Sequence, residues 1–163
     1  MLYCKRKNST NWQFPQGGID KNEDIFDAAL RELYEEVGIE ENKIKLIKES
    51  DNWYKYDLPK KYKRNSFLWE SFKGQKQKWF LFKLIEETKI DLNNENNPEF
   101  DEFNWVDYWK PLDEIVEFKR EIYEKVLTEL EPAYKSESVS NTHLTAHETN
   151  GYRVCRLQRE KWG

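Results

Sequence analysis

Five segments of this chain carry the alternation or the composition of β-strands. Alternation of apolar and polar residues with a period of two is typical of a half-buried strand, and a continuous apolar run is typical of a strand inside a sheet. The second half of residues 75–85 is such a run, whereas 43–50 and 53–59 alternate. The predicted strands are residues 2–7, 43–50, 53–59, 75–85 and 103–109.

Apolar residues at helical spacing predict helices in three other places. The first helix is expected to begin between Asp20 and Glu23 and to end at Gly38, since glycine suits the left-handed position after a helix. A short helix follows Pro111, and a longer one carries an apolar residue at every fourth position: Phe118, Ile122, Val126 and Leu130. Strands mixed with a few helices predict an α+β fold, a layered α/β/α sandwich around a mixed sheet.

Length and composition fit one soluble domain. The chain has 163 residues, 37% of them apolar, which is enough for one core and too little for two. No apolar run approaches the roughly 20 residues of a membrane helix, so we expect a cytoplasmic protein without membrane partners. Two cysteines do not suggest a disulfide framework. The net charge of -4 gives no general attraction to nucleic acids, so a phosphate-containing substrate needs positive charge close to its binding site.

Histidine is absent from residues 1–135, because both histidines, His143 and His147, come later. A domain within this range therefore has no histidine for base catalysis, for a Ser-His triad or for a Cys-His pair. Carboxylates are the groups that remain for catalysis.

Three glutamates crowd one turn of the first predicted helix, in RELYEEVG. Glu32, Glu35 and Glu36 stand at i, i+3 and i+4, so their side chains converge on one patch opposite the apolar stripe. Like charges at this spacing repel one another unless a cation neutralises them. Hard carboxylate oxygens suit Mg²⁺, with Mn²⁺ as the alternative, so the turn predicts a metal site.

The sequence around this turn follows a longer pattern. Residues GGIDKNEDIFDAALRELYEEVGI fit glycine, five residues, glutamate, seven residues, then R-E-apolar-x-E-E-x-G-apolar. A short EExxG alone is typical of a solvated helix face, but nine specified positions within 23 residues are not. The segment resembles the Nudix box, the signature of the Nudix hydrolases, which cleave pyrophosphate bonds in nucleoside diphosphates linked to another group. In that family Glu23 and Arg31 form a pair that supports the loop and the helix.

The flanking segments narrow the resemblance to one branch of the family. WQFPQGG, WYKYDLP, GQKQKWFLF, NPEFDEFNWVDYW and VEFKREIY occur in the order found in bacterial RNA pyrophosphohydrolases, also described as dinucleoside polyphosphate hydrolases. The similarity extends from about Leu2 to Leu130. It implies Mg²⁺-dependent hydrolysis of the 5′-triphosphate of RNA to a 5′-monophosphate with release of pyrophosphate, a step that initiates mRNA decay.

The resemblance also assigns roles to individual residues. It implies that Glu32, Glu35, Glu36 and Glu99 are metal ligands, with the Gly17 carbonyl as a further ligand. Either Glu99 or Glu32 would polarise the attacking water, and the sequence does not choose between them. The positions that match those holding the 5′ end of RNA are Arg6, Tyr56, Gln75, Phe118 and Lys119. Without the resemblance, Tyr56 and Phe118 fit core aromatics and Lys119 fits a solvated helix residue.

Other functions remain open alternatives. Diadenosine polyphosphates would use the same metal ions, and other Nudix substrates include nucleotide sugars and damaged nucleoside triphosphates. An alternative of another class is an inactive, truncated or RNA-binding protein. Protein partners cannot be inferred from the sequence.

The two ends of the chain complete the domain prediction. The resemblance places a further strand and a basic residue ahead of LYCKRK, so residues 1–135 are predicted to be an N-terminally truncated Nudix domain with an unpaired sheet edge. Residues 136–163 lack periodicity and are expected to be a disordered or non-native tail; THLTAHET and VCRL resemble translated adapter peptides.

Overall fold

Strand β6 (Gly74–Leu84) lies inside the larger of two sheets. The second half of its sequence is apolar at consecutive positions, and the structure buries both faces. Trp79 and Leu81 pack into one core, while Phe80 and Phe82 pack into another. A strand buried on both faces needs a covering layer on each side of the sheet.

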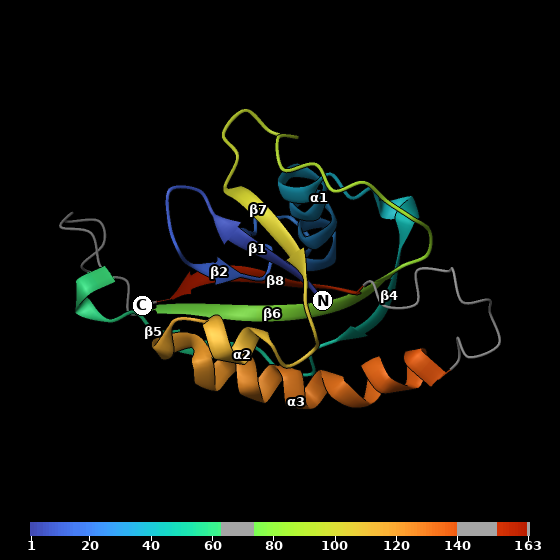
Figure 1. The fold of residues 1–163 in the computed structure, drawn as a ribbon. Coiled ribbons are helices and arrows are strands. Elements are labelled where there is room, and N and C mark those ends of the chain that lie inside the picture. Colours follow the sequence, from blue (N-terminus) through green and yellow to red (C-terminus); the bar gives the residue numbers. More distant parts are fainter. Residues whose placement is uncertain (63–73, 140–152, 163) are drawn as a thin grey trace.

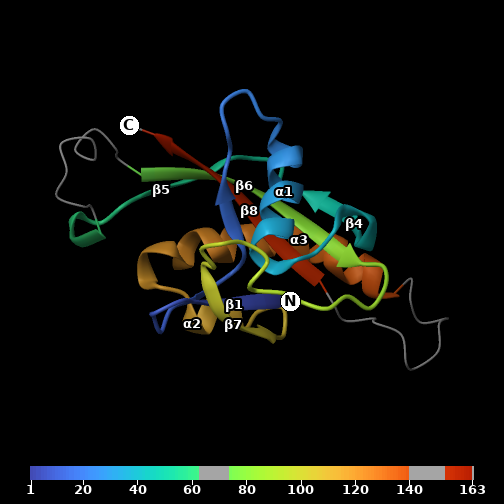
Figure 2. The ribbon, with the colours of Figure 1, turned by 90° about the horizontal axis from the view of Figure 1, so that it is seen from above.

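The computed structural model describes residues 1–62, 74–139 and 153–162. In Figure 1, helix α1 (Ile25–Val37) and the smaller sheet lie above β6, and helices α2 (Pro111–Glu114) and α3 (Glu117–Val139) lie below it. Figure 2 shows α1 lying over β6 and β8, with α3 behind the same strands. These layers confirm the predicted α+β sandwich.

The larger sheet combines parallel and antiparallel pairs. Its order is β3-β8-β6-β4, and β5 pairs with the remaining length of β6. Among the described strands of this sheet, β3 and β8 alone run parallel; β8, β4 and β5 each run antiparallel to β6. The other strands of this sheet are β3 (Gln16–Gly18), β4 (Ile44–Glu49), β5 (Tyr54–Asp57) and β8 (Arg153–Trp162).

The smaller sheet has three antiparallel strands in the order β2-β1-β7. They are β2 (Trp12–Gln13), β1 (Leu2–Arg6) and β7 (Phe100–Trp105). Strand β1 separates the two cores: Tyr3 packs with α3 residues, whereas Leu2 packs with α1 residues.

Helix α1 (Ile25–Val37) has defined caps at both ends. The Asp24 side chain accepts hydrogen bonds from the N–H groups of Phe26 and Asp27, as an N-cap does. Gly38 has φ 70°, and its N–H donates to the Tyr34 carbonyl. The predicted end of the helix is therefore confirmed, while its first residue comes later than predicted because Asp24 supplies the cap.

The opposite layer contains α2 (Pro111–Glu114) and α3 (Glu117–Val139). The Glu129 side chain ties α3 to the sheet, since it accepts hydrogen bonds from the Tyr54 hydroxyl and the Asp51 N–H. Two short 3₁₀ turns, Glu41–Lys43 and Lys60–Tyr62, connect other elements. The two helices predicted after Pro111 are thus confirmed.

The C-terminal region differs from its expected disorder. Helix α3 continues to Val139, and Arg153–Trp162 form strand β8 between β3 and β6. The backbone of β8 supplies hydrogen-bonding partners to both β3 and β6, so these two strands are not unpaired edges at this place. That residues 1–135 are an N-terminally truncated domain and that the tail is non-native stays a prediction. The remainder of the predicted tail, 140–152 and 163, lies outside the described residues.

Two short strands were also missed. The segment 8–18, for which no strand was predicted, contains β2 and β3. Each has only two or three residues, too few to show a period of two. Among the described helices, none is both long and apolar enough to cross a membrane.

Gly74 allows β5 to lie against the start of β6. A Cβ atom added at this position would come within 1.9 Å of the Tyr56 carbonyl oxygen. We expect Gly74→Ala to lower the free energy of unfolding by about 1–3 kcal/mol, because the pairing of β5 with β6 must shift. Urea denaturation measures this change, with Gly18→Ala as the control, since a Cβ there meets nothing within 4 Å. Equal stability of the two variants would contradict the expectation.

Candidate active site

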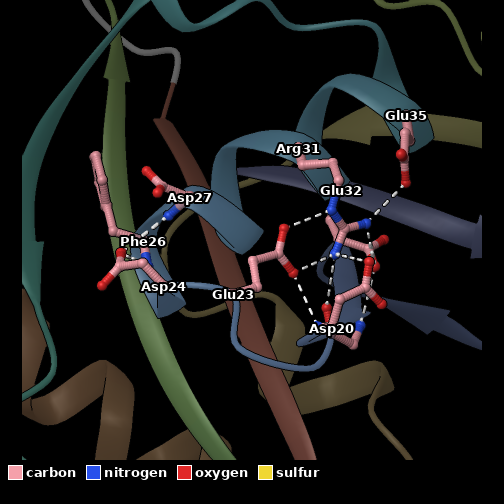
Figure 3. A network of polar contacts seen from close by, with 9 residues as sticks. Asp20, Glu23, Asp24, Phe26, Asp27, Arg31, Glu32 and Glu35 are labelled. Carbon is pink, nitrogen blue, oxygen red and sulfur yellow. Dashed lines mark hydrogen bonds and ion pairs between the residues drawn. The ribbon is translucent and has the colours of Figure 1, made fainter.

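Arg31 gathers the acidic groups of the loop before α1 and of the helix itself. Its Nε and Nη2 donate to the two oxygens of Glu23 at 2.7 and 2.8 Å, and its Nη1 donates to Glu32 and Glu35 at 3.1 Å each. Figure 3 shows these carboxylates directed toward the guanidinium, with Asp20 beside them. The Asp20 Oδ2 atom lies 3.7 Å from Arg31 Nη2. Four carboxylates around one cation leave an excess of negative charge on this side of the helix.

The same network fixes the backbone of the glycine-containing loop. The Gly18 N–H donates to Glu32 Oε1 at 3.1 Å, and the Gly18 carbonyl accepts from Arg31 at 3.3 Å. Glu23 in turn accepts a hydrogen bond from the Asp20 N–H. The support that the resemblance implied for Glu23 and Arg31 is therefore visible as a direct contact between loop and helix.

Arg31 lowers the pKa of Glu23 to about 2 from an ordinary value of 4.5. The largest cause is the hydrogen bond from the guanidinium, and the Asp20 N–H adds to it. Glu23 is thus ionised at any physiological pH. It acts as a fixed anion that holds Arg31 and not as a proton carrier.

Glu36 and Glu99 complete the predicted set of carboxylates, and each has a buried side-chain oxygen. Glu36 is 3% exposed although it lies on the acidic face of α1. Glu99 precedes β7, and its Oε2 atom is buried without a hydrogen-bond partner in the described part of the chain. Its neighbour Phe100 packs in the same core as Leu33 of α1, which brings this loop toward the helix.

The carboxylate oxygens of these glutamates are ligand atoms of the type that a hard divalent cation prefers. Buried carboxylate oxygen and excess negative charge are both stabilised by such an ion. As the side chains lie here, the residues at 1–62, 74–139 and 153–162 include no group of three or more His, Cys, Asp or Glu placed to hold a metal ion. In this arrangement Glu32 and Glu35 form ion pairs with Arg31. Gly17 lies in β3, where it pairs with Gln158, and its role as a ligand stays a prediction.

All five residues predicted to hold the 5′ end of RNA line one pocket of about 190 Å³: Arg6, Tyr56, Gln75, Phe118 and Lys119. They come from β1, β5, β6 and the start of α3, far apart in the sequence. The fold therefore brings the predicted set together.

Aromatic rings and polar groups are ordered within this pocket. The rings of Tyr56 and Phe118 lie 5.7 Å apart at 47°, with the Lys119 Nζ about 6 Å from both ring centres. The Tyr56 hydroxyl donates to Gln75 Oε1 at 2.5 Å, which leaves the Gln75 amide NH₂ as a donor. Tyr56 is also 8% exposed and part of the core, so the alternative of a core aromatic holds as well.

The pocket contains further residues that the sequence did not suggest. Among them are Trp12, Gln13 and Gln16, from the short strands β2 and β3. Their only signal was the occurrence of polar residues in the WQFPQGG segment. Burial of Gln13 and Gln16 depends on tertiary packing and could not be inferred.

Strand β3 connects the pocket with the acidic helix. Gln16, at its start, lines the pocket, and the N–H of Gly18, at its end, donates to Glu32. A pocket with cations and aromatic rings next to clustered carboxylates is the arrangement expected of a metal-assisted hydrolase of phosphate compounds.

A comparison with known families agrees with this class. The model of the NUDIX domain matches residues 1–126. The chain belongs to the Nudix family and is a Nudix hydrolase. Members of this family generally use divalent metal ions.

Curated relatives resemble most of the chain. An RNA pyrophosphohydrolase of Actinobacillus pleuropneumoniae serotype 3 is 44% identical over 139 residues, which are 85% of this chain and 68% of the relative. One from Shewanella denitrificans is 41% identical over 87% of this chain and 83% of its own length. One from Francisella tularensis subsp. mediasiatica is 46% identical over 78% and 82%, respectively. The family resemblance stated from the sequence is confirmed.

The Glu23–Arg31 contact makes the free energy of unfolding depend on pH in the acid range. Because the pKa of Glu23 is lowered in the folded state, its stabilisation is present above pH 4.5 and is lost as the pH falls toward 2. We expect Glu23→Gln to lower the free energy of unfolding by about 1.5–3 kcal/mol at pH 7 and by little near pH 2. Urea denaturation across this range in chelator tests it, with the exposed Glu87→Gln as control. A difference that does not depend on pH would contradict it.

Proposed function

We propose that this protein hydrolyses the 5′-triphosphate of RNA to a 5′-monophosphate and releases pyrophosphate, the step that prepares a message for decay. The observation that carries the proposal is the continuity of the site. The pocket, lined by Gln16, and the acidic helix, held by Gly18, are two residues apart on β3. The names of the similar proteins support the choice of RNA as substrate.

Within the pocket, the roles divide by charge. Arg6, Lys119 and the Gln75 amide are donors suited to the phosphates, and only local cations can attract a polyanion to a chain of net charge -4. Tyr56 and Phe118 offer ring faces suited to an unpaired base.

The acidic residues would perform the hydrolysis. Glu32, Glu35, Glu36, Glu99 and the Gly17 carbonyl would hold Mg²⁺, with Mn²⁺ as the alternative. The bound metal would supply charge neutralisation and a more acidic water. Glu32 already accepts hydrogen bonds from Gly18 and Arg31, whereas Glu99 Oε2 accepts none among the described residues. This difference favours Glu99 as the group that accepts the proton of the attacking water.

A dinucleoside polyphosphate is the second candidate substrate. It carries the same phosphate chain and the same stacking groups as the RNA end. The pocket of about 190 Å³ is smaller than the roughly 300–1,000 Å³ typical of sites that enclose a whole small molecule, so it suits one base at a time. Both substrates can therefore enter it, and only a comparison of rates separates them.

Loss of one acidic group should abolish hydrolysis. Glu36→Gln keeps the shape of a buried side chain and removes its charge, so we expect pyrophosphate release from a 5′-triphosphorylated RNA to fall more than about 100-fold. Glu41 is exposed and lies in the same acidic region of the sequence, so Glu41→Gln should leave the rate unchanged. The assay uses Mg²⁺ and measures both pyrophosphate and the 5′-monophosphate RNA.

Two results would contradict the proposal. Equal rates for wild type and Glu36→Gln would remove the acidic helix from the reaction. Rapid hydrolysis of diadenosine tetraphosphate or a nucleotide sugar, with no hydrolysis of the RNA by the folded protein, would assign the site to another substrate.

A further inference from the structure

Two glutamines in the wall of the pocket form a buried pair. Gln13 and Gln16 are 3% and 1% exposed, and Gln16 Nε2 donates to Gln13 Oε1 at 3.2 Å. The other atom of each amide, Gln13 Nε2 and Gln16 Oε1, has no hydrogen-bond partner among the described residues. Buried amide groups are nearly always hydrogen-bonded, so these two atoms call for a partner that the described residues do not provide.

The pair always offers one donor and one acceptor. If both amides rotate by 180°, the bond between them reverses, and the remaining groups become Gln13 Oε1 and Gln16 Nε2. The order of donor and acceptor thus exchanges while their positions stay the same. A ligand edge with one donor next to one acceptor satisfies the pair in either order.

A nucleobase has such an edge. Adenine presents an amino group beside a ring acceptor, and guanine presents a carbonyl beside a ring N–H, in the opposite order. An ionised phosphate only accepts hydrogen bonds, so it would leave the acceptor of this pair without a partner, whereas Arg6 and Lys119 in the same pocket are suited to phosphate by their charge. The rings of Tyr56 and Phe118 provide faces on which the same base can stack.

We propose that Gln13 and Gln16 are specificity-determining residues that hydrogen-bond the edge of one nucleobase at the 5′ end of the RNA. This inference rests on the proposed function, because it assumes RNA in the pocket. Since the pair can reverse, it selects for the presence of a polar base edge and tolerates different bases. We therefore expect slower hydrolysis of an RNA that carries a base of similar shape without this donor–acceptor edge.

The test compares two 5′-triphosphorylated RNA oligomers. One has adenosine and the other a benzimidazole nucleoside, which keeps a ring face and lacks donors and acceptors on its six-membered ring. The replacement is made at the first or at the second nucleotide. We expect kcat/KM of the wild type to be about 5- to 150-fold lower for benzimidazole at one of these positions.

Variants that cannot form hydrogen bonds locate the effect. Gln16→Met and Gln13→Met should each lower kcat/KM for the adenosine RNA to near that for the benzimidazole RNA. Gln77→Met is the matched control, because Gln77 is 1% exposed, has no hydrogen-bond partner for its amide in the described part of the chain, and does not line this pocket. The control should keep the full preference. Thermal denaturation shows which variants are folded. If only one of Gln13→Met and Gln16→Met is folded, that variant alone is enough for the test.

The outcomes separate this inference from the proposed function. Hydrolysis of both RNAs at equal rates by the wild type, or an undiminished preference in a folded pocket variant, overturns the inference and leaves the RNA hydrolase intact. Equal loss of preference in Gln77→Met also overturns it, because the effect is then one of burial alone. No hydrolysis of either RNA by the folded wild type overturns the proposed function and the inference with it.

Discussion

One guanidinium makes the acidic face of α1 compatible with the loop that precedes it. Arg31 contacts carboxylates from both segments, and four of them lie within 4 Å of it. Without this cation, like charges would push the loop away from the helix. The position of Gly18, and through it the position of β3, depends on the same contacts. The acidic helix and the pocket are therefore joined by one local charge balance.

The two cores place this balanced segment in the fold. Strand β6 sends Trp79 toward α3 and Phe80 toward α1, so a single strand supports the pocket layer and the acidic helix. Close approach of β5 at Gly74 brings Tyr56 beside Gln75. Packing thus determines the distance between the part that would bind the RNA end and the part that would hydrolyse it.

Sequence periodicity predicted the long elements and failed where contacts are not local. The apolar stripe and the glycine at 38 were enough to locate α1, and β6 was evident from its apolar run. Strand β3 has three residues and exists because β8 pairs with it, a contact across more than 130 residues of chain. The five pocket residues were suggested by family resemblance, while Gln13 and Gln16 became visible only through burial and missing partners.

The most direct test of this account is the thermal stability of Arg31→Met with and without Mg²⁺. In chelator, the melting temperature should be about 4–10 °C below that of the wild type, since the carboxylates lose their shared cation. Added Mg²⁺ should restore part of the difference, because a divalent cation can neutralise the same groups. Lys125→Met, which removes an exposed ion pair with Glu121, should show neither effect. An Arg31→Met protein as stable as the wild type in chelator would contradict the central role of this guanidinium.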